Sequence, residues 1–524
     1  MWNPPMALTP EEHNMAARTR QARQCFVFLR EPRHEWLEAT FPATLTETSR
    51  AAPGGTAPVA AGLLALATLL QAYGQVGDRD AVARTVLDKR GQRGGDGLGA
   101  EPPPLSPSTL WHLRLRLIAP NRDKILRERP VTWAEHTGGL GARPLRAALA
   151  ATPLFGAGRV EAPWTLLGHA LRQAVGLAAR ALGVSAEAMR EDAGWVLGGH
   201  RSLKAALALD GGQPKARERA LRVVRAAGDR WQTWLEQPLR LREAGAPRQD
   251  VMDPLAQMVT PDTDPAPAGG PGGTRLKPQV APERRISLAD ADMRHGRKRS
   301  AKTFNGFQAP CGLAVDRQVT RAVVVCPANE PEHEAVAWLV ETWEQPPGLR
   351  PLASALGARA SPRMPPWAAQ GVDIMARPWP QGGPHLTQDD GTCDCGPGQV
   401  TCPGGQTVPM VPGQDAQCPA SACDGGPQRA QCPTARSGQG RRLSLREAEP
   451  LQHQLRAKIT TKRGRAARRQ RTAVEHAISP HLAHQGRRAR SKGLRQNQFA
   501  GRRHAAVSNL QVAAHDVEER QLAS

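Results

Sequence analysis

GLAVDRQ at residues 312–318 and TRAVVVCPAN at residues 320–329 decide the fold class of this chain. The two segments are rich in β-branched and other apolar residues and lie close together, which predicts a hairpin-like pair of strands. Residues 334–342 have the spacing of a helix, and GVDIMARP near Val372 is typical of a short strand. Strands and helices mix here, so the sequence predicts an α/β (mixed) fold.

The chain before this pair is predicted to be largely helical. Residues 63–86 have apolar residues at helical spacing, and Asp78 can cap the second of two helices, so we expect a helical hairpin. The apolar run over residues 58–73 is shorter than the roughly 20 residues that span a bilayer. It therefore indicates a buried helix, and we expect no membrane segment.

A basic helix is predicted in LSPSTLWHLRLRL, residues 105–117. Ser106 or Ser108 can cap it, and it bears Arg114 and Arg116. A basic helix after a turn suits helix-turn-helix docking to DNA. The alternative is an ordinary amphipathic helix that buries its leucines while its arginines are merely solvated. The sequence leaves both interpretations open.

The next segments differ in how clearly they indicate a structure. Residues 145–160 fit either a helix end or a strand and turn, because Ala favours helix while the flanking Gly and Pro break it. Residues 167–182 form a clear amphipathic pattern, and helical spacing continues over residues 203–241. Residues 261–282 are dense in Pro and Gly, which predicts a linker or a disordered loop.

The charge of the chain indicates a polyanionic partner. Lys and Arg number 70 against 48 Asp and Glu, a net charge of +22 over 524 residues. The alternative is a solvated basic surface from a GC-rich genome, but the charge is concentrated near the end of the chain, which favours nucleic acid. The basic residues there are Lys458, Lys462, Arg463, Arg465, Arg468, Arg469, Arg471, Arg487, Arg488, Arg490, Lys492, Arg495, Arg502 and Arg503.

Two features of the sequence favour the cytoplasm as the location of the protein. The first 20 residues lack the charged start, apolar stretch and cleavage site of a secretory signal. Nine cysteines, an odd number, suit a reduced protein better than a disulfide scaffold. We therefore expect a cytoplasmic protein.

Five strings occur in a specific order and spacing. They are PPPLSPSTLWHLRLRL near Leu110, ATPLFGAGRV from Ala151, DADMRHGRKRSAKTFNGFQ from Asp290, VVVCPANEPEHEA from Val323, and RTAVEHAIS from Arg471 onward to SNLQVAAH. Together they resemble an insertion-sequence transposase of the DDE superfamily, in the group with an InsH-type helical N-terminal domain and a cysteine-bearing insert. The resemblance runs nearly end to end.

The resemblance implies an RNase H-like catalytic core that cuts and joins DNA strands. In that core, carboxylates on the first and fourth strands and on a following helix hold two Mg²⁺ or Mn²⁺ ions. Two divalent ions about 4 Å apart stabilise the attacking and leaving oxygens of an in-line phosphoryl transfer, and hard cations prefer carboxylate oxygens. The implied partner is double-stranded DNA with terminal inverted repeats, bound by a homo-oligomer at the nucleoid.

The resemblance assigns one catalytic carboxylate and finds two missing. Glu475 matches the family's glutamate and lies one helical turn after Arg471. Ala150 and Ala355 stand where the family has its two aspartates. A methyl group cannot coordinate a cation, so we expect a degenerate, catalytically impaired copy. Three nearby acids could only replace the lost ligands by chance: Glu161, Asp316 and Asp373.

The expected organisation combines these segments in chain order. It consists of a helical N-terminal DNA-binding domain (1–140), the first core strand (141–157), a helical insertion (158–260), a linker (261–283), core strands and helices (284–380), a cysteine-containing insert (381–440) and basic C-terminal helices that complete the core (441–524).

The cysteine-containing insert has near-zinc spacing. Cys402, Cys423 and Cys432 could form a tetrahedral Zn²⁺ site, with Cys418, Cys393 or Cys395 as the fourth ligand. Gly426 stands where a C-x-x-C partner of Cys423 would be, so free thiols in a polar loop are the leading alternative.

The predicted function is that of a transposase whose cleavage is impaired, and the alternative is a non-catalytic DNA-binding protein or repressor derived from one. An RNA-binding basic protein is supported by composition alone. The predicted DNA contacts are Ser108, Arg114, Arg116, Arg471, Arg487, Arg488, Arg490 and Lys492.

Overall fold

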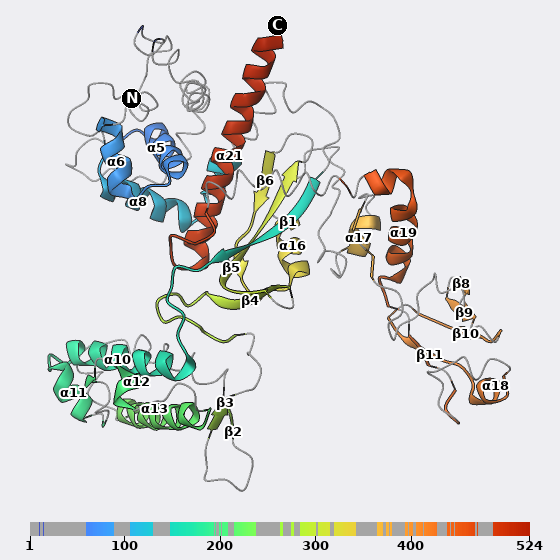
Figure 1. Cartoon of the computed structure of the whole chain (residues 1–524), viewed down its shortest axis with the longest axis horizontal. Coiled ribbons are helices and arrows are strands. Elements are labelled where there is room, and N and C mark those ends of the chain that lie inside the picture. The colour runs from blue at the N-terminus through green and yellow to red at the C-terminus, as the bar shows by residue number, and fades with distance from the viewer. Residues whose placement is uncertain are drawn as a thin grey trace.

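The structure is a computed structural model of the whole chain. It describes residues 10, 14, 59–87, 105–128, 147–192, 194, 199–200, 202–207, 214–236, 263–265, 274–276, 283–299, 302–314, 319–341, 364–369, 374–376, 378–379, 394–396, 398–401, 405–411, 413–426, 438–440, 442–444, 446–466, 469 and 486–523. Figure 1 shows a central sheet, helices beside it and two outlying parts.

The central sheet is built on β5, a 13-residue strand that pairs with every other member. Its strands are β1 (Ala147–Phe155), β4 (Arg294–Arg299), β5 (Lys302–Ala314), β6 (Val319–Val323) and β7 (Cys326–Pro327), and all pairs are antiparallel. The β5–β6 pair confirms the predicted hairpin. The undecided segment around Ala150 is a strand, because it pairs with β5 along its whole length, from Ala147 opposite Ala314 to Phe155 opposite Gly306.

Gly306 permits β1 and β5 to approach closely. Its φ is +144°, and a Cβ there would lie 2.3 Å from the Gly156 nitrogen and 2.4 Å from the Leu154 oxygen. We expect Gly306→Ala to destabilise the fold by about 3 kcal/mol, because both contacts are to backbone that cannot rotate away. Urea unfolding would measure this. Gly176→Ala, at an open position within a helix, is the control and should stabilise by about 0.5–1 kcal/mol; equal effects of both substitutions would contradict the prediction.

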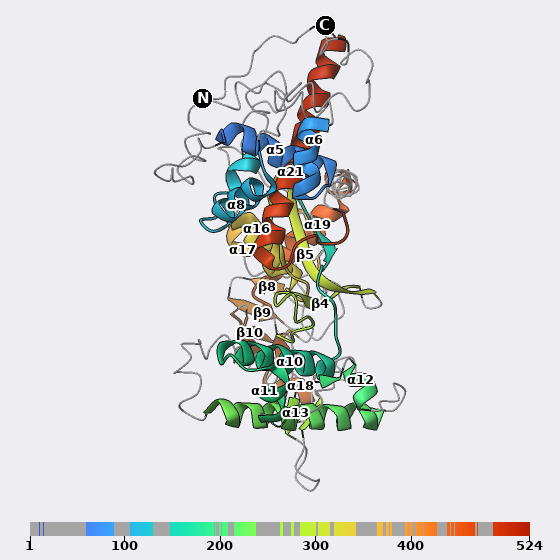
Figure 2. The ribbon, with the colours of Figure 1, turned by 90° about the vertical axis from the view of Figure 1, so that its left-hand side faces the viewer.

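Three helices precede the sheet and pack against the last helix of the chain. They are α5 (Ala61–Gly74), α6 (Asp78–Leu87) and α8 (Pro107–Ile118), and the last helix is α21 (Leu494–Ala523). Figure 1 shows α21 running between these helices and the sheet, and in Figure 2, seen from the side of the helices, α5, α6 and α8 overlap α21. The predicted helical hairpin is confirmed by α5 and α6, which are joined by a turn at Gln75 in the left-handed conformation.

Helix α5 is apolar on nearly all sides because it is covered on two faces. Leu66, Leu69 and Ala72 pack with α21 and with the ends of β5 and β6. Leu63 and Leu64 pack with α6, α8 and Phe499 of α21. An all-round apolar helix is a buried helix, as predicted. None of the described helices is long and apolar enough to cross a membrane.

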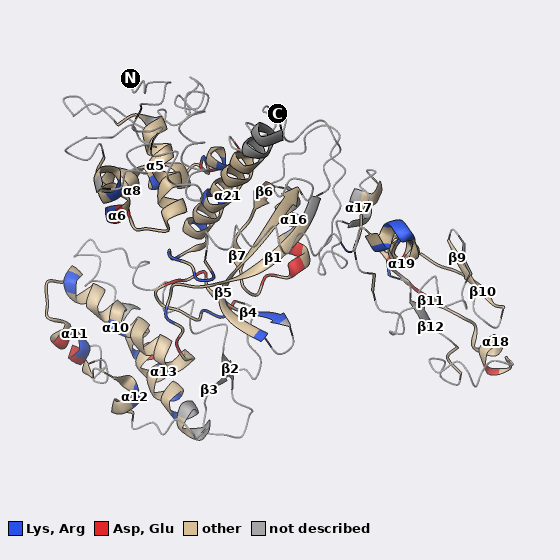
Figure 3. Ribbon diagram, turned by 45° about the horizontal axis from the view of Figure 1, so that its top comes forward, with Lys and Arg blue, Asp and Glu red and all other residues tan. Residues whose placement is uncertain are grey.

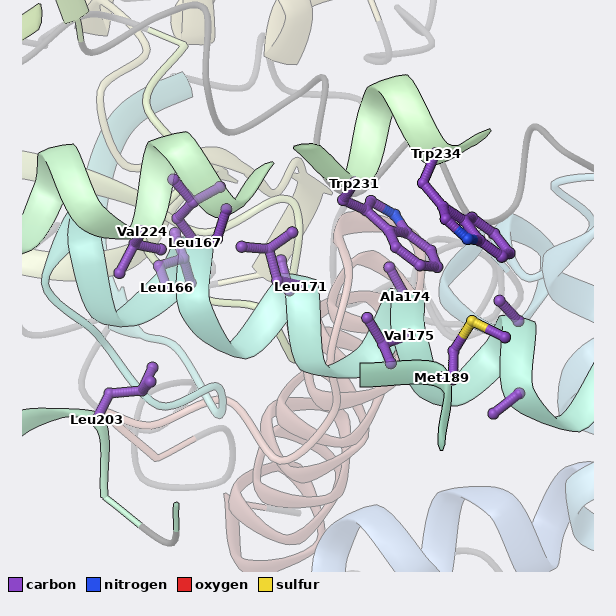
Figure 4. Packing of buried hydrophobic residues seen from close by; sticks show 14 residues of the cluster. Leu166, Leu167, Leu171, Ala174, Val175, Met189, Leu203, Val224, Trp231 and Trp234 are labelled. Atoms are coloured by element: carbon purple, nitrogen blue, oxygen red, sulfur yellow. The ribbon is translucent and has the colours of Figure 1, made fainter. Parts of the chain in front are cut away.

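A separate helical bundle follows β1, where the helical insertion was expected. It contains α10 (Pro163–Ala181), α11 (Ala186–Asp192), α12 (Leu203–Ala206) and α13 (Pro214–Glu236). Trp231 and Trp234 of α13 stack with centroids 4.9 Å apart and cover Ala174, Val175 and Met189 (Figure 4). The aromatic pair closes one end of an otherwise aliphatic core.

The middle of the chain differs from one expectation and leaves another untested. The described residues of the predicted linker form an antiparallel pair, β2 (Thr263–Pro265) and β3 (Thr274–Leu276), and the linker itself stays a prediction. Residues 374–376, expected in a strand near Val372, have no regular secondary structure but are buried. The predicted helix is present as α16 (Glu332–Glu341).

The remaining elements are short and lie to one side of the sheet in Figure 1. They are α17 (Met364–Ala369), β8 (Asp394–Gly396), β9 (Gln399–Thr401), β10 (Thr407–Pro409), β11 (Asp415–Gln417), α18 (Ala420–Asp424), β12 (Arg442–Ser444) and α19 (Glu449–Thr460). The first three strands form one small antiparallel sheet, and β11 pairs with β12. Lys and Arg are conspicuous on α19 and β4 (Figure 3).

Candidate functional site

The predicted basic helix is α8, and the structure resolves how it begins. Ser106, and not Ser108, caps it, because the Ser106 hydroxyl accepts from the Thr109 N–H at 3.2 Å. Ser108 is exposed, and its hydroxyl lies 2.8 Å from that of Ser106. The apolar face of α8 is buried at Leu110, Leu113 and Leu117. The amphipathic interpretation therefore holds for the inner face of the helix.

The two arginines of α8 differ in their surroundings. Arg116 is exposed. Arg114 is partly buried, and its Nη2 lies 2.5 Å from Asp78 Oδ1 at the start of α6. Asp78 thus joins the two helices through its side chain. Because one nitrogen of the Arg114 guanidinium is paired with Asp78, only the rest of that group is available to a ligand.

A basic segment is docked at the end of β1. The basic segment is defined by Arg487, Arg488, Arg490 and Lys492, all of them exposed. Its backbone forms a parallel bridge with β1, because Phe155 N donates to Arg487 O at 2.8 Å and Ala489 N donates to Phe155 O at 2.7 Å.

A buried alanine anchors the same segment. The Ala489 side chain lies in an apolar cluster with Leu154 of β1 and Phe307 of β5. Residues 487, 488 and 490 are exposed while residue 489 is buried, so the Ala489 side chain anchors the segment with its basic neighbours at the surface. Four of the predicted DNA contacts are brought together in this way.

Two other basic residues of the same region serve the fold instead. Asp123 is fully buried, and its Oδ1 lies 2.6 Å from Arg495 Nη2 and 3.0 Å from Arg502 Nη1. Arg495 also donates to the Ile118 carbonyl at 2.8 Å, and Arg502 to Asn121 Oδ1 at 2.7 Å. This network ties α21 to the end of α8. Sequence analysis missed it, since residues some 370 positions apart carry no shared local pattern.

Ala150 lies in the middle of β1. It is opposite Cys311 of β5, which in turn is opposite Val323 of β6. The Cys311 thiol donates to the Ala150 carbonyl at 3.6 Å, and burial raises the pKa of Cys311 to about 12, so the thiol is neutral. The register partners of Ala150 therefore supply no anionic ligand.

Most of the other positions that the sequence connected with catalysis lie outside the part of the chain that the structure describes. Ala355, Arg471, Glu475, Asp316 and Asp373 lie outside the described residues. Glu161 is described, and its carboxylate is occupied by His169, with Nδ1 2.9 Å away. Among the described residues, no three His, Cys, Asp or Glu side chains are grouped closely enough to hold a metal ion.

Two aspartates position the start of α21 beside the basic segment. Asp292 Oδ2 accepts from the Leu494 N–H, the first of the helix, at 2.7 Å. Asp290 is buried, and its Oδ1 accepts from the Asp292 N–H at 3.2 Å. Burial raises the pKa of Asp290, and backbone hydrogen bonds from Gly493 and Asp292 oppose that rise. Burial thus makes the charge of Asp290 costly, whereas Asp292 is the acceptor for the first N–H of the helix.

This difference predicts opposite effects of neutralising the two side chains. A raised folded-state pKa means that the charged form of Asp290 destabilises the fold above that pKa, and the penalty disappears once pH falls below the ordinary pKa. Asp290→Asn should therefore raise the melting temperature at neutral pH, with the gain vanishing in acid. Asp292→Asn should lower it, because a carboxylate stabilises a helix N-terminus. Thermal melts from pH 3 to 8 measure both, and a lower melting temperature for Asp290→Asn at pH 7 would contradict the assignment.

The cysteine-containing insert is only partly described. Cys418 is buried in a small core with Val400, Val408 and Met410, and Cys423 packs against it. Cys402 and Cys432 lie outside the described residues. The predicted zinc site stays a prediction, and Cys418 contributes to the apolar packing of this small core.

The comparisons with known proteins gave one result. The family model described as a transposase DDE domain matches residues 401–514. The match begins in β9, ends within α21, and includes the basic segment and Glu475. Neither the search of curated proteins nor the search of solved structures gave a match. Residues 401–514 are therefore similar to the DDE domain of transposases.

Proposed function

We propose that this chain is an insertion-sequence transposase that binds the terminal inverted repeats of its element and whose cutting and joining of DNA is impaired. The observation that carries the proposal is the docking of the basic segment on β1. Within the matched range, Arg487 and Arg488 are exposed directly beside the end of the strand that holds Ala150. By resemblance, that strand is where an RNase H-like core has its first carboxylate.

The charge arrangement supports DNA as the partner. Arg487, Arg488, Arg490 and Lys492 lie within six residues and are all exposed. Arginine and lysine side chains held on a rigid backbone contact phosphates and release counterions, which gives sequence-independent affinity that falls steeply with salt. The exposed Ser108 and Arg116 of α8 are the second set of contacts, and Arg471 the third. A homo-oligomer assembled on paired DNA ends at the nucleoid in the cytoplasm completes the proposal.

Impairment follows from the ligand set. Mg²⁺ or Mn²⁺ needs carboxylate oxygens, and the side chain of Ala150 is a methyl group. Its strand neighbours are Cys311, a neutral thiol that donates to the Ala150 carbonyl, and beyond it Val323. The described residues do not fit a pair of divalent ions at β1. We therefore derive no reaction step through a metal in the chain as it stands.

A combined binding and nicking assay tests the proposal. Labelled terminal-repeat duplex, a shuffled duplex and an RNA hairpin of equal length would be titrated with the protein in Mg²⁺ or Mn²⁺. We expect retention of the terminal-repeat duplex without nicking. Preference for the RNA, or equal affinity for all three, would contradict the proposal.

The alternative function is that of a non-catalytic DNA-binding protein that acts as a repressor. It is favoured by the same Ala150, since a scaffold without chemistry can still occupy the DNA ends. The two functions differ in whether DNA cleavage can be restored. Replacing Ala150 and Ala355 by aspartate should restore nicking in an impaired transposase and should give none in a non-catalytic repressor.

A further inference from the structure

Three arginines gather around a single carboxylate where α5, α6, α8 and α21 meet. We call Arg114, Arg490, Arg503 and Asp78 the arginine cluster. Asp78 Oδ1 is 2.5 Å from Arg114 Nη2 and 2.6 Å from the Nε2 of Gln71, which donates to it. The cluster joins segments more than 400 residues apart in sequence, so it exists only in the folded chain.

Two glutamines of α5 connect the other arginines to the same place. Arg503 Nη1 donates to Gln71 Oε1 at 2.5 Å. Arg490 donates to the Gln75 carbonyl and, through Nη2 at 3.0 Å, to Gln75 Oε1. Gln75 has a positive φ of 51°, which turns its carbonyl out of the end of α5 toward Arg490. Glutamine oxygens are neutral acceptors, so they orient the guanidinium groups without balancing their charge.

The cluster carries more positive charge than it can compensate. Three guanidinium groups face one carboxylate, an excess of two charges. Burial, together with the charge of Arg114, lowers the pKa of Arg503 to about 9. Arg503 Nε is buried and has no hydrogen-bond partner among the described residues. Buried cations are normally paired, so the arrangement lacks an anion.

The surroundings of the cluster allow an anion to enter. Arg490 is exposed, and Arg114 and Asp78 keep about a fifth of their side-chain surface exposed, 20% and 23%. A fourth guanidinium lies close by, since a Cβ on Gly74 would be 2.6 Å from Arg84 Nη1. The exposed side chains of Arg487, Arg488 and Lys492 continue from Arg490 along the basic segment.

We propose that the arginine cluster is a phosphate-binding site that takes a backbone phosphate of the bound DNA, with Arg490 and Arg114 as ligands and the half-buried Arg503 behind them. This inference rests on the proposed function for the source of the phosphate. It adds Arg503 to the predicted DNA contacts and joins the N-terminal helices and the basic segment into one binding surface. A tetrahedral phosphate fits several guanidinium groups at once because each is a planar fork of donors.

The salt dependence of DNA binding tests the inference. Fluorescence anisotropy would give the dissociation constant for a terminal-repeat duplex at salt concentrations between about 50 and 300 mM. The proteins compared are the wild type, Arg490→Gln, Arg490→Lys and Arg180→Gln. Losing one phosphate contact makes the slope of log affinity against log salt shallower by about one. We expect that change for Arg490→Gln only. Arg490→Lys keeps the charge, and Arg180 is an exposed arginine of α10 outside the cluster.

A second measurement separates failure of this inference from failure of the proposed function. Inorganic phosphate should raise the melting temperature of the wild type above that in chloride of equal ionic strength, and the rise should be lost in Arg490→Gln. If the wild type binds no DNA but phosphate stabilises it in this way, the proposed function fails while the anion site stands. An unchanged DNA slope in Arg490→Gln, with or without phosphate stabilisation, overturns the assignment of a DNA phosphate to the cluster.

Discussion

Replacing Ala150 and Ala355 together by aspartate is expected to make a DNA-binding chain that does not nick terminal-repeat DNA into one that does. Ala150 lies on a strand held along its length by β5, so an aspartate there would be placed by a rigid element. By resemblance, the two aspartates and Glu475 would complete the set of carboxylates for two metal ions. Members of such a unit act together, and restoring them should raise the nicking rate by roughly 10³-fold or more.

The controls for this prediction follow from the need for all three ligands. Each single replacement should stay inactive, and so should the double variant with asparagines in place of aspartates, because a neutral amide binds Mg²⁺ weakly. Glu475→Gln in the aspartate double variant should abolish nicking again. If the chain as it stands nicks DNA and Glu475→Gln abolishes that activity, the positions assigned to the missing ligands are wrong. If the folded double variant binds DNA and never nicks it, another part of the reaction has been lost.

Asp123→Ala is expected to cost about 3–5 kcal/mol of stability, because it breaks a buried ion pair. Asp123 is fully buried, and the Arg502 side chain that it pairs with is 8% exposed. Removing the carboxylate leaves a buried guanidinium without a counter-charge, and it also releases Arg495 from the end of α8. Native proteins are stable by about 5–15 kcal/mol, so the loss is a large share of the total.

The measurement is the urea midpoint together with hydrogen exchange of α8 and α21 amides. Asp229→Ala, at an exposed position of α13, is the matched control and should change the midpoint little. Asp123→Leu combined with Arg502→Met should recover part of the loss, because a well-packed apolar pair can replace a buried ion pair. A midpoint for Asp123→Ala equal to that of the control would show that the network does not hold α21 to the N-terminal helices.

The strength of each local pattern decided how much of this fold could be predicted. The helical spacing of residues 63–86 and 167–182 became α5, α6 and α10, and the apolar pair at residues 312–329 became β5 and β6. In each case several consecutive residues favour the same element and have one face to bury. The identity of α8 also followed from its capping serine, leucine spacing and basic residues, all of which are local.

What remained undecided or wrong depended on partners far away in sequence. The alanine-rich segment at Ala150 became a strand because β5, some 160 residues later, offers a full ladder of backbone partners. Likewise, net charge predicted a basic DNA-binding surface but could not assign individual arginines to it. Arg502 pairs with the buried Asp123, whereas Arg487 is held outward by Ala489. The helices and strands with strong local patterns, and the basic character of the chain, followed from neighbouring residues alone. The strand at Ala150 and the availability of each arginine to a ligand depended on the folded chain, because pairing and burial involve contacts between residues far apart in sequence.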